Sequence, residues 1–410
     1  MSLREDASYI IRQAVGSVLP GPGVSKALQE MQLPEGRLVV VAAGKAAYPM
    51  ASAALKVLGN RIAEGLVVTV PGGIPAGLPI FTCMEAGHPI PDDRSFRAAD
   101  TAISMVKSLT EKDAVLLLLS GGASSLFEKP AVPADALARI TELLLRSGAS
   151  ITEMNTVRKH LSYIKGGRFA LLASPATVHT LVLSDVIGND ISVIGSGPAY
   201  PDPSTSDEAI RILEKYRIEV APEILDVILH ETPKTLRNVD VKVIGDVSML
   251  CAGARKACAD LGYETVLLTD ALSCEAREAG HMFADIAWTY QKVRRSLAFI
   301  AGGEPVVHVR GNGKGGRCQE MALSAAIGME NFTGTCFFSI GSDGTDGPTD
   351  AAGGIVDESV CAHIRASGLD PVRCLEWNDA YTALREAKSL IITGPTGTNV
   401  NDLSVLLIRR

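Results

Sequence analysis

The sequence predicts an α/β fold in which a mainly parallel sheet carries helices on both faces. Short apolar runs alternate with helical segments along the whole chain. Several of these runs lead directly into a glycine-containing turn with a polar residue, at 38–45, 115–122, 180–185 and 337–343. Strands buried on both faces have unbroken apolar sequences, and ligands of such sheets bind beyond the carboxyl ends of the strands. The strand-end polar residues are therefore the first candidates for a functional site.

Length and composition narrow the class of protein. The chain has 410 residues, of which 47% are hydrophobic and 21% charged, so it is expected to form two or three compact domains. A net charge of -7 argues against nucleic acid as a partner. The eight cysteines contain no Cys-x-x-Cys pair and are interpreted as reduced core residues. Without a signal peptide or an apolar span, the chain is expected to be cytoplasmic with no membrane partner, while a homo-oligomer is left open.

The strand and helix candidates follow from periodicity and turn residues. Helices are expected at 95–109, 133–147 and 248–261, and the charged segment 208–231 is expected to be largely helical. Strand candidates lie near Leu38, Gly65, Ala114, Val178, Val241, Glu264, Ser296, Gly303 to Arg310, Thr335 and Leu390.

A domain boundary is predicted near Val239, within about ten residues. The proline-rich stretch 198–205 suits neither a strand nor a helix, so it is expected to be a shaped loop. Beyond the charged helical segment, the strand near Val241 is interpreted as the start of a second series of strands. The predicted domains are therefore 1–239 and 240–410.

Two strand-end turns in the N-terminal half are candidate anion sites. Lys45 interrupts an apolar turn before a helix start, where a cation could hold a phosphate beside helix amides, although a surface lysine is the alternative. The glycine-rich turn 120–125 could bind a phosphate or a carboxylate through its amides, or could be a tight turn whose serines cap a helix. Its candidate residues are Ser120, Gly121, Gly122, Ser124 and Ser125.

Further charged residues in this half could assist. Arg158 and Lys165 are seven residues apart in a predicted helix, so they are expected on one face, either meeting an anion together or as solvated charges. His160 falls near the buried stripe of that helix and is interpreted as a core histidine. Asp185 and Asp190 follow another strand and could bind Mg²⁺ or accept a hydroxyl proton. An Asx turn is the alternative, and it suits Asp190 better.

The C-terminal half contains three polar, glycine-rich segments. The segment 311–317 fits the G-x-G-x-x-G pattern but lacks the acidic residue that a dinucleotide fold requires, so a phosphate-covering loop with Arg317 as its cation is the better interpretation. Segments 341–350 and 393–402 are interpreted as ligand-facing turns, with plain loops as the alternative. The candidate nucleotide-binding residues are Gly313, Lys314, Gly315, Gly316, Asp343, Thr345, Asp346 and Asn399.

Together these segments resemble the class II glycerate 2-kinases, the family with a C-terminal MOFRL domain. The resemblance extends over almost the whole chain. It rests on Gly-Lys at 44–45, Gly-His-Pro-Ile-Pro-Asp at 87–92, Ser-Gly-Gly at 120–122, Asn-Thr-Val-Arg-Lys-His-Leu at 155–161, Gly-Gly-Arg-x-Gln-Glu at 315–320, Asp-Gly-Thr-Asp-Gly-Pro-Thr-Asp-Ala-Ala at 343–352 and Thr-Gly-Pro-Thr-Gly-Thr-Asn-Val-Asn-Asp at 393–402.

The resemblance implies a fold and an activity. It implies two three-layer α/β/α domains with a cleft between them: a larger, Rossmann-like N-terminal domain with a mainly parallel sheet, and a C-terminal domain with a mixed sheet. It also implies ATP-dependent phosphorylation of D-glycerate to 2-phosphoglycerate, with Mg²⁺. Lys45 and Arg317 match the family's catalytic cations, and Asp185 matches an aspartate near the same site. Asp185 or Asp346 is the expected metal ligand.

Some residues differ from the family pattern, and two alternative functions remain open. Ala123 and Ser125 replace a usual Gly and Ala, and Cys318 replaces a frequent Asn, which leaves the exact 2-hydroxy acid open. The rivals are an NAD(P)H-dependent hydroxypyruvate reductase and a non-catalytic module that binds a phosphorylated metabolite. The incomplete dinucleotide pattern and the lack of a well-placed histidine argue against the reductase.

Overall fold

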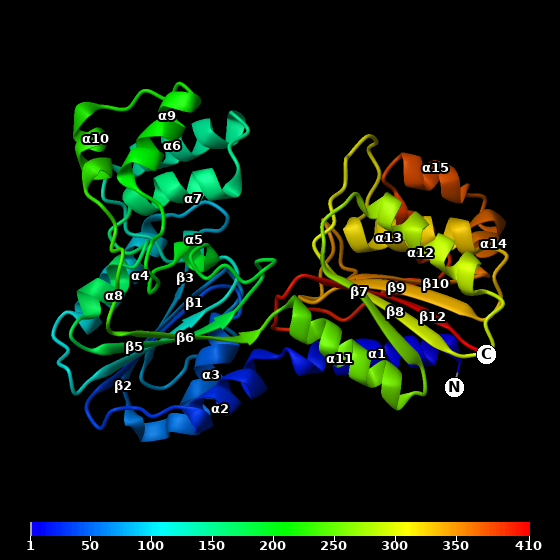
Figure 1. The fold of residues 1–410 in the computed structure, drawn as a ribbon, viewed down its shortest axis with the longest axis horizontal. Helices are drawn as coiled ribbons and strands as arrows, with labels where there is room; N and C mark the ends of the chain where they lie inside the picture. The colour runs from blue at the N-terminus through cyan, green and yellow to red at the C-terminus, as the bar shows by residue number, and fades with distance from the viewer. Residues whose placement is uncertain (1) are drawn as a thin grey trace. The chain divides into compact units, whose positions relative to one another are not determined.

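The chain forms two compact units. The computed structural model describes residues 2–410. The N-terminal unit comprises Pro20–Ile244, and the C-terminal unit comprises Gly245–Arg410 together with the residues up to Leu19. Each unit is a sheet with helices on its faces (Figure 1).

The N-terminal sheet has the strand order β3-β2-β1-β4-β5-β6. This is the doubly wound order in which the chain reverses direction across the sheet between β1 and β4. The pairings of β1 with β2 and β4, of β2 with β3 and of β4 with β5 are parallel. The strands are β1 (Leu38–Ala43), β2 (Ile62–Thr69), β3 (Phe81–Glu85), β4 (Ala114–Leu119), β5 (Thr177–Leu183) and β6 (Val239–Gly245).

The central strands of this sheet are covered on both faces. Every residue of β1 and of β4 is buried, as their unbroken apolar sequences predict. Helix α4 begins at a capping box in which Asp92 accepts hydrogen bonds from the amides of Arg94 and Ser95. The helices flanking the sheet are α2 (Pro20–Glu30), α3 (Ala47–Leu58), α4 (Asp93–Val106), α5 (Ala123–Leu126) and α8 (Arg168–Ala173), with a 3₁₀ turn, η1 (Gly59–Arg61), before β2.

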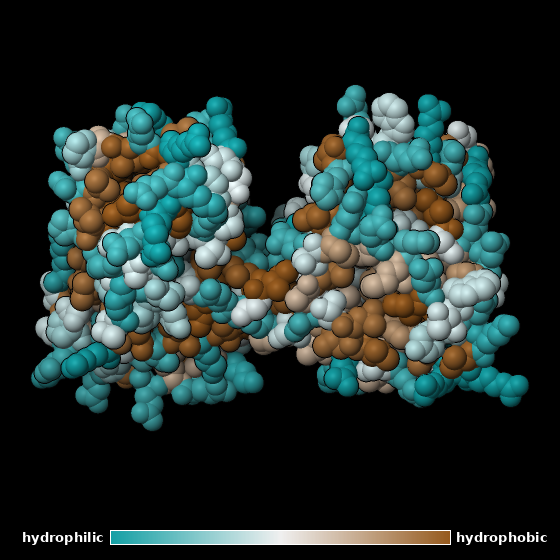
Figure 2. Space-filling view, turned by 45° about the horizontal axis from the view of Figure 1, so that its top comes forward, coloured by the Kyte–Doolittle hydropathy of each residue, from teal (hydrophilic) through white to brown (hydrophobic). Residues whose placement is uncertain are grey.

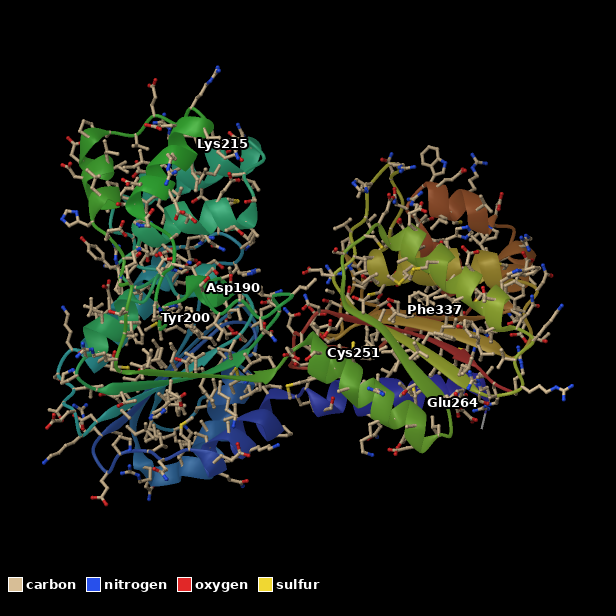
Figure 3. The ribbon with its side chains drawn as sticks, viewed as in Figure 1. Asp190, Tyr200, Lys215, Cys251, Glu264 and Phe337 are labelled. Atoms are coloured by element: carbon tan, nitrogen blue, oxygen red, sulfur yellow. The ribbon has the colours of Figure 1, made fainter. Side chains whose placement is uncertain are left out.

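Four helices of the N-terminal unit form a separate layer with its own core. They are α6 (Ala134–Arg146), α7 (Ile151–His160), α9 (Ser206–Lys215) and α10 (Pro222–Leu229), drawn at the top of the unit in Figure 1. Leu144, Val157 and Leu213 are among the buried residues that they share. Lys215 lies at the end of α9 (Figure 3). This layer adds a second small core beyond the one under the sheet.

The C-terminal sheet is mixed, with the order β11-β10-β9-β12-β8-β7. Only β7 and β8 are paired in parallel, and β12 is antiparallel to both β8 and β9. The strands are β7 (Glu264–Leu272), β8 (Leu297–Gly303), β9 (Thr335–Gly341), β10 (Gly353–Asp357), β11 (Leu390–Ile391) and β12 (Asp402–Ile408). The mixed sheet and the parallel N-terminal sheet confirm the predicted fold class.

Helices cover both faces of the C-terminal sheet. Helices α1 and α11 pack together on one face, and α12 and α13 pack together on the other (Figure 1). Phe337 of β9 stacks on Phe283 of α12 with ring centroids 4.8 Å apart, and Figure 3 marks its place in the sheet. The helices are α1 (Leu3–Ser17), α11 (Val247–Asp260), α12 (Ala276–Tyr290), α13 (Arg317–Met329), α14 (Val360–Ala366), α15 (Pro371–Glu376) and α16 (Ala380–Glu386).

The N-terminal unit ends at Ile244, within about ten residues of the predicted boundary near Val239. The division follows β6, because β6 is the last strand of the N-terminal sheet and does not begin the second series of strands. Helix α1 packs on α11 and β9, which places the start of the chain in the C-terminal unit. A periodicity argument cannot detect either pairing, because both join segments that are distant in sequence.

Individual elements also differ from the prediction. The predicted strand at Gly303 to Arg310 is wrong: β8 ends at Gly303, and the segment beyond it makes one isolated bridge between Val306 and Glu275. Strands β3, β10 and β12 had not been expected at all. Polar residues interrupt β3, and glycines begin β10, so neither has the apolar run that marks a buried strand.

The surface of both units is largely hydrophilic in the face shown, with scattered hydrophobic patches (Figure 2). Within residues 2–410, no helix is long and apolar enough to cross a membrane. Seven of the eight cysteines are buried or partly buried and one, Cys274, is exposed; none forms a disulfide. The prediction of core cysteines is thus confirmed for the six buried ones and is wrong for the exposed Cys274.

Candidate active site

Lys45 and the Ser120–Gly122 turn lie at the switch point of the N-terminal sheet. Lys45 follows β1, and the turn follows the adjacent strand β4. The amide of Lys45 donates to the Gly121 carbonyl at 2.9 Å, and the amide of Ala46 donates to Ser120 Oγ at 3.0 Å. Ligands of doubly wound sheets bind at this position. The structure therefore brings together two of the segments that the sequence singles out.

The side chain of Lys45 is exposed, and its ammonium forms no hydrogen bond or ion pair with any residue of the described range 2–410. The backbone below it is tightly fixed. Gly44 has φ +125°, and a Cβ at this position would lie 2.2 Å from Ser120 Oγ, so no other residue fits. The result is a rigid turn that presents an unpaired cation to a ligand.

His88 lies beside this turn. A Cβ on Gly122 would be 3.1 Å from His88 Cδ2, 3.2 Å from its Nε2 and 3.5 Å from Lys45 Cγ. Gly122 also has φ +86°, so both its conformation and its neighbours favour glycine. Partial burial, and then the charge of Lys45, hold the pKa of His88 below its ordinary value of 6.5. A neutral imidazole therefore stands next to the cation.

Arg158 and Lys165 converge on the Ser124 carbonyl. Arg158 Nη2 lies 3.1 Å and Lys165 Nζ 2.7 Å from this oxygen. The predicted shared helix face is wrong, because α7 ends at His160 and Lys165 lies in the turn beyond it. Their meeting point is nevertheless the predicted serine-glycine turn.

Lys165 stabilises this turn through contacts in the protein interior. Its ammonium is completely buried and contacts the Phe127 carbonyl at 3.3 Å and Glu128 Oε2 at 3.1 Å, in addition to Ser124. Burial lowers the pKa of Lys165 to about 8, and the charge of Glu128 opposes this effect. Since its hydrogens already face protein oxygens, Lys165 is placed to position the turn. Ser125 does the same locally, because its Oγ donates to the Gly122 carbonyl at 3.1 Å.

The loop at residues 195–197 has a strained backbone and lies beside Ser124 of the turn. Gly195, Ser196 and Gly197 all have positive φ, an unusual conformation for the fully buried Ser196. They belong to the 3₁₀ turn η2 (Ile194–Ser196) and its end. Ser196 Oγ lies 3.2 Å from Asn155 Oδ1 and 3.4 Å from Ser124 Oγ. Such strain persists only when surrounding contacts fix it, and it is often found at functional sites.

Asp185 and Asp190 occupy different environments. Asp185 directly follows Ser184 at the end of β5 and is partly exposed. Asp190 is exposed, and its Oδ1 accepts hydrogen bonds from the amide and the hydroxyl of Ser192 at 2.9 and 2.7 Å (Figure 3). These contacts are those of an Asx turn. The structure thus gives Asp190 a local role and leaves Asp185 at a strand end.

Arg317 in the C-terminal unit is held by two carboxylates. Its Nε and Nη2 contact Asp402 at 2.5 and 3.0 Å, and its Nη1 contacts Glu304 Oε1 at 2.8 Å. The Asp402 side chain is 4% exposed, whereas that of Glu304 is 48% exposed. Burial acts to lower the pKa of Arg317, but the hydrogen bonds and charge of Asp402 outweigh it, so the pKa is raised. Burial raises the pKa of Asp402 to about 6 against the influence of Arg317.

Asp346 caps α13. Its carboxylate accepts hydrogen bonds from the amides of Cys318 and Gln319 at 3.1 and 2.9 Å and from Gln319 Nε2 at 2.9 Å. A Cβ on Gly316 would lie 2.3 Å from Asp346 Cγ, so the glycine permits this approach. Both carboxylate oxygens are therefore bonded to protein donors, and Asp346 does not fit a metal ligand. Across residues 2–410, no group of three or more His, Cys, Asp and Glu side chains could hold a metal ion.

The glycine-rich loop before α13 is tied to the segment between α15 and α16. The amides of Arg310 and Gly311 donate to Asn378 Oδ1 at 2.6 and 3.0 Å, and the amide of Lys314 donates to Asp379 Oδ1 at 3.0 Å. Lys314 Nζ also lies 4.4 Å from the ring centroid of Tyr381. A Cβ on Gly311 would lie 2.4 Å from the Trp377 carbonyl, and one on Gly313 would lie 2.5 Å from Asp379 Cβ. Gly311 and Gly313 thus permit close packing of the loop on this segment.

The two C-terminal turns contact each other. Asp343 Oδ1 accepts hydrogen bonds from the amide and hydroxyl of Thr345, both at 2.9 Å, which makes an Asx turn. The amide of Thr396 donates to the Asp343 carbonyl at 3.1 Å, so the segment containing Asn399 packs beside the turn at 341–346. The predicted C-terminal residues therefore form one surface around the start of α13 and the end of β9.

Sequence reasoning did not identify several residues around these cations. His88 lies in the Gly-His-Pro-Ile-Pro-Asp segment at 87–92 but is not among the predicted site residues. Glu128, Glu304 and Asp402 were not identified because their partners are distant in sequence. The detectable signal was Asp402, an acidic residue at the start of an apolar run.

Two family models match the chain. Residues 6–229 match the "Domain of unknown function (DUF4147)", and residues 297–402 match the MOFRL family. The first match lies mainly in the N-terminal unit and the second lies in the C-terminal unit. The two matched regions contain Lys45 and Arg317, respectively.

Known proteins resemble the chain over its full length. A D-glycerate 2-kinase from Thermotoga maritima is 48% identical, and the alignment covers 99% of each chain. A crystal structure of a glycerate kinase from the same organism matches with a TM-score of 0.96 and 49% identity, and covers 99% of each chain. A putative hydroxypyruvate reductase from Agrobacterium vitis is 42% identical over 91% of this chain and all of that protein. The chain therefore belongs to the glycerate kinase family whose C-terminal region is of the MOFRL type.

Proposed function

We propose that this chain is a glycerate 2-kinase, which transfers the γ-phosphoryl group of ATP to the C2 hydroxyl of D-glycerate and releases 2-phosphoglycerate and ADP. The observation that carries the proposal is the unpaired, exposed ammonium of Lys45 at the switch point of the sheet. Phosphoryl transfer requires positioned cations, because negative charge spreads over the oxygens of the transferred group. The kinase names of the full-length relatives support the same reaction.

The glycerate carboxylate is assigned to the Ser120–Ser125 turn. The amides of Ala123 and Ser125 are bonded to carbonyls within the turn, whereas those of Gly121, Gly122 and Ser124 form no backbone hydrogen bond with the described part of the chain. These three amides are the donors that we propose for the carboxylate. Arg158 adds positive charge at the Ser124 end, and Lys165 fixes the turn.

Lys45 and Arg317 are each proposed to supply positive charge for phosphoryl transfer. Lys45 is free to contact the γ-phosphate, and Arg317 is presented in a fixed orientation by Asp402. Cations fixed in advance stabilise the transition state without reorganising during the reaction. We further propose that the nucleotide contacts the C-terminal surface formed by Gly313–Gly316, Asp343, Thr345 and Asn399.

A divalent ion is included in the proposal as the usual companion of ATP. Mg²⁺ bound to ATP neutralises phosphate charge, and it generally needs only one or two protein carboxylates. Asp185 is the carboxylate that we propose for this contact, or for the hydroxyl proton, since Asp346 is committed to α13. This assignment requires no cluster of three acidic residues.

The test is to identify the product. Purified protein incubated with D-glycerate, ATP and Mg²⁺ is expected to release ADP, and ³¹P–¹H correlation NMR is expected to show phosphate coupled to the C2 proton. Oxidation of NADH in the presence of hydroxypyruvate, without any ADP release from glycerate, would favour the reductase instead. Binding of glycerate with neither reaction would indicate a non-catalytic module.

A further inference from the structure

His88 occupies the open side of the turn that carries Lys45. His88 follows β3, the edge strand of the sheet. Its ring nevertheless lies beside the turn that follows β4, although β2 and β1 separate β3 from β4 in the sheet order. The side chain is exposed, and in the described residues it has no hydrogen bond or ion pair. Its ring nitrogens are therefore available to a ligand bound beside Lys45 and Gly122.

The position of His88 distinguishes it from the other six histidines. Four of them have protein partners: His160 contacts the Thr156 carbonyl, His179 contacts Asp240, His230 contacts the Asp226 carbonyl and His308 contacts Glu275. His281 and His363 lie on helices α12 and α14, away from strand ends. Among the partner-free histidines of residues 2–410, only His88 lies at a strand-end turn of a sheet.

The charges around His88 keep its ring neutral near pH 7. Partial burial and the Lys45 ammonium both lower its pKa, as described above. Glu85 and Asp92 are the nearest carboxylates along the chain, and both are engaged elsewhere. Glu85 Oε1 accepts a hydrogen bond from the Gly72 amide at 2.9 Å. Asp92 accepts hydrogen bonds from the Gly87, Arg94 and Ser95 amides and from the Arg94 side chain. Burial would raise the pKa of Asp92, yet these contacts lower it to about 2, so the carboxylate stays engaged at the start of α4. His88 thus has an unprotonated nitrogen without a competing internal acid.

We propose that His88 is a catalytic residue that contacts the C2 hydroxyl of the bound glycerate and accepts its proton. This inference rests on the proposed function and specifies one of its groups. The C2 oxygen forms a bond to the γ-phosphorus while the bond from that phosphorus to the bridging oxygen of ADP breaks. The hydroxyl proton passes to the unprotonated ring nitrogen of His88 and leaves to solvent after the product departs.

A neutral base avoids a charge repulsion that a carboxylate would bring to this position. The transferred phosphoryl group is negatively charged, and a carboxylate beside it would add a second negative charge. Imidazole accepts the proton without adding negative charge, and Lys45 supplies the positive charge at the same place. His88 is therefore assigned to the C2 hydroxyl of glycerate, and Asp185 is assigned to the Mg²⁺ bound to ATP.

Kinetic comparison of matched variants is the first test. His88→Gln and His88→Asn are expected to lower kcat about 100-fold, the lower end of the range for a general base, with a smaller change in KM for D-glycerate. His363→Gln, an exposed histidine of the C-terminal unit, serves as the control and is expected to keep wild-type turnover. Wild-type kcat in both His88 variants would overturn the proposal.

Histidine ring NMR of the wild-type protein is the second test and does not depend on how the variants fold. The His88 signal is identified as the one missing from the His88→Gln spectrum or, if that variant does not fold, from the His88→Asn spectrum. Adding D-glycerate without ATP is expected to shift this signal and leave the His363 signal in place. An unmoved His88 signal in a protein that releases ADP from glycerate and ATP would overturn the role of His88 alone. Absence of ADP release in the wild type would instead overturn the proposed function.

Discussion

The two candidate catalytic cations are held in opposite ways. Lys45 rests on a rigid glycine turn, and its ammonium has no partner in residues 2–410. Arg317 is gripped by the buried Asp402 on one edge and by the half-exposed Glu304 on the other. A flexible point charge without a partner can follow a phosphoryl group as it moves, whereas a fixed guanidinium fork can only meet a ligand that arrives in the right orientation. We infer that the Lys45 ammonium adapts its position to the ligand, whereas the Arg317 guanidinium fixes the orientation in which the ligand binds.

Removing the free cation is expected to have the largest effect on turnover. Lys45→Ala should lower kcat about 1,000-fold, since preorganised charge at a developing anion contributes this much. Its free energy of unfolding should stay within about 0.5 kcal/mol of wild type, because the exposed side chain has no internal partner. Steady-state ADP release and urea denaturation measure the two quantities. Wild-type turnover would remove Lys45 from the mechanism.

Breaking the buried pair of Lys165 should instead mainly affect stability. Lys165→Met leaves the fully buried Glu128 without its counter-charge, and removing one partner of a buried ion pair costs about 3–5 kcal/mol. The double variant Lys165→Met/Glu128→Leu should recover most of this loss. Urea denaturation of the three proteins provides the measurement. Equal stability of wild type and Lys165→Met would contradict the positioning role.

The two carboxylates that contact Arg317 should contribute unequally to the stability of the protein. At pH 5, Asp402→Asn is expected to destabilise the protein by about 2 kcal/mol, because the buried side chain loses hydrogen bonding to the charged Arg317. Glu304→Gln should cost less than about 1 kcal/mol, because the pair is partly exposed and screened by solvent. The latter change also frees Nη1 of Arg317, so KM for ATP should fall. Similar losses of stability in the two variants would show that burial does not separate the roles of the two carboxylates.

A further expected effect is a pH dependence of stability due to Asp402. Its pKa is about 6 in the folded protein against an ordinary value of 3.8. Between these two values the native state binds more protons than the unfolded state, so the Asp402 contribution to stability is present at about pH 4 and is lost as pH rises through about 6. The free energy of unfolding of wild type minus that of Asp402→Asn should therefore decrease over this range. A difference that stays constant with pH would contradict the assignment.

The N-terminal unit was more predictable from the sequence than the C-terminal one. Strands β1 and β4 are apolar throughout, and their terminal turns contain Lys45 and Ser120, so local pattern alone located them. The C-terminal sheet is largely antiparallel, and strand β12 joins β8 to β9 only because of long-range pairing. Asp402 begins that strand, which explains why the partner of Arg317 was not found.

The difference between the predicted and observed roles of Asp346 has a similar origin. Its acidic segment suggested a metal, but the carboxylate instead caps α13, 27 and 28 residues earlier in the chain. A carboxylate in a polar loop can serve either as a metal ligand or as an acceptor for the amides of a helix start, and the sequence does not separate the two. Only the position of α13 separates the two interpretations.

The most direct test of the account is a double-mutant cycle on Lys45 and Arg317. Lys45→Ala, Arg317→Lys and the combined variant are compared with wild type by kcat for ADP release, with folding checked by circular dichroism. If both cations act in the same phosphoryl-transfer step, the loss in the combined variant should be well below the product of the two single losses, because groups that act as a unit are not additive. A fully multiplicative loss would show that the two cations work independently and would contradict their proposed joint role in this step.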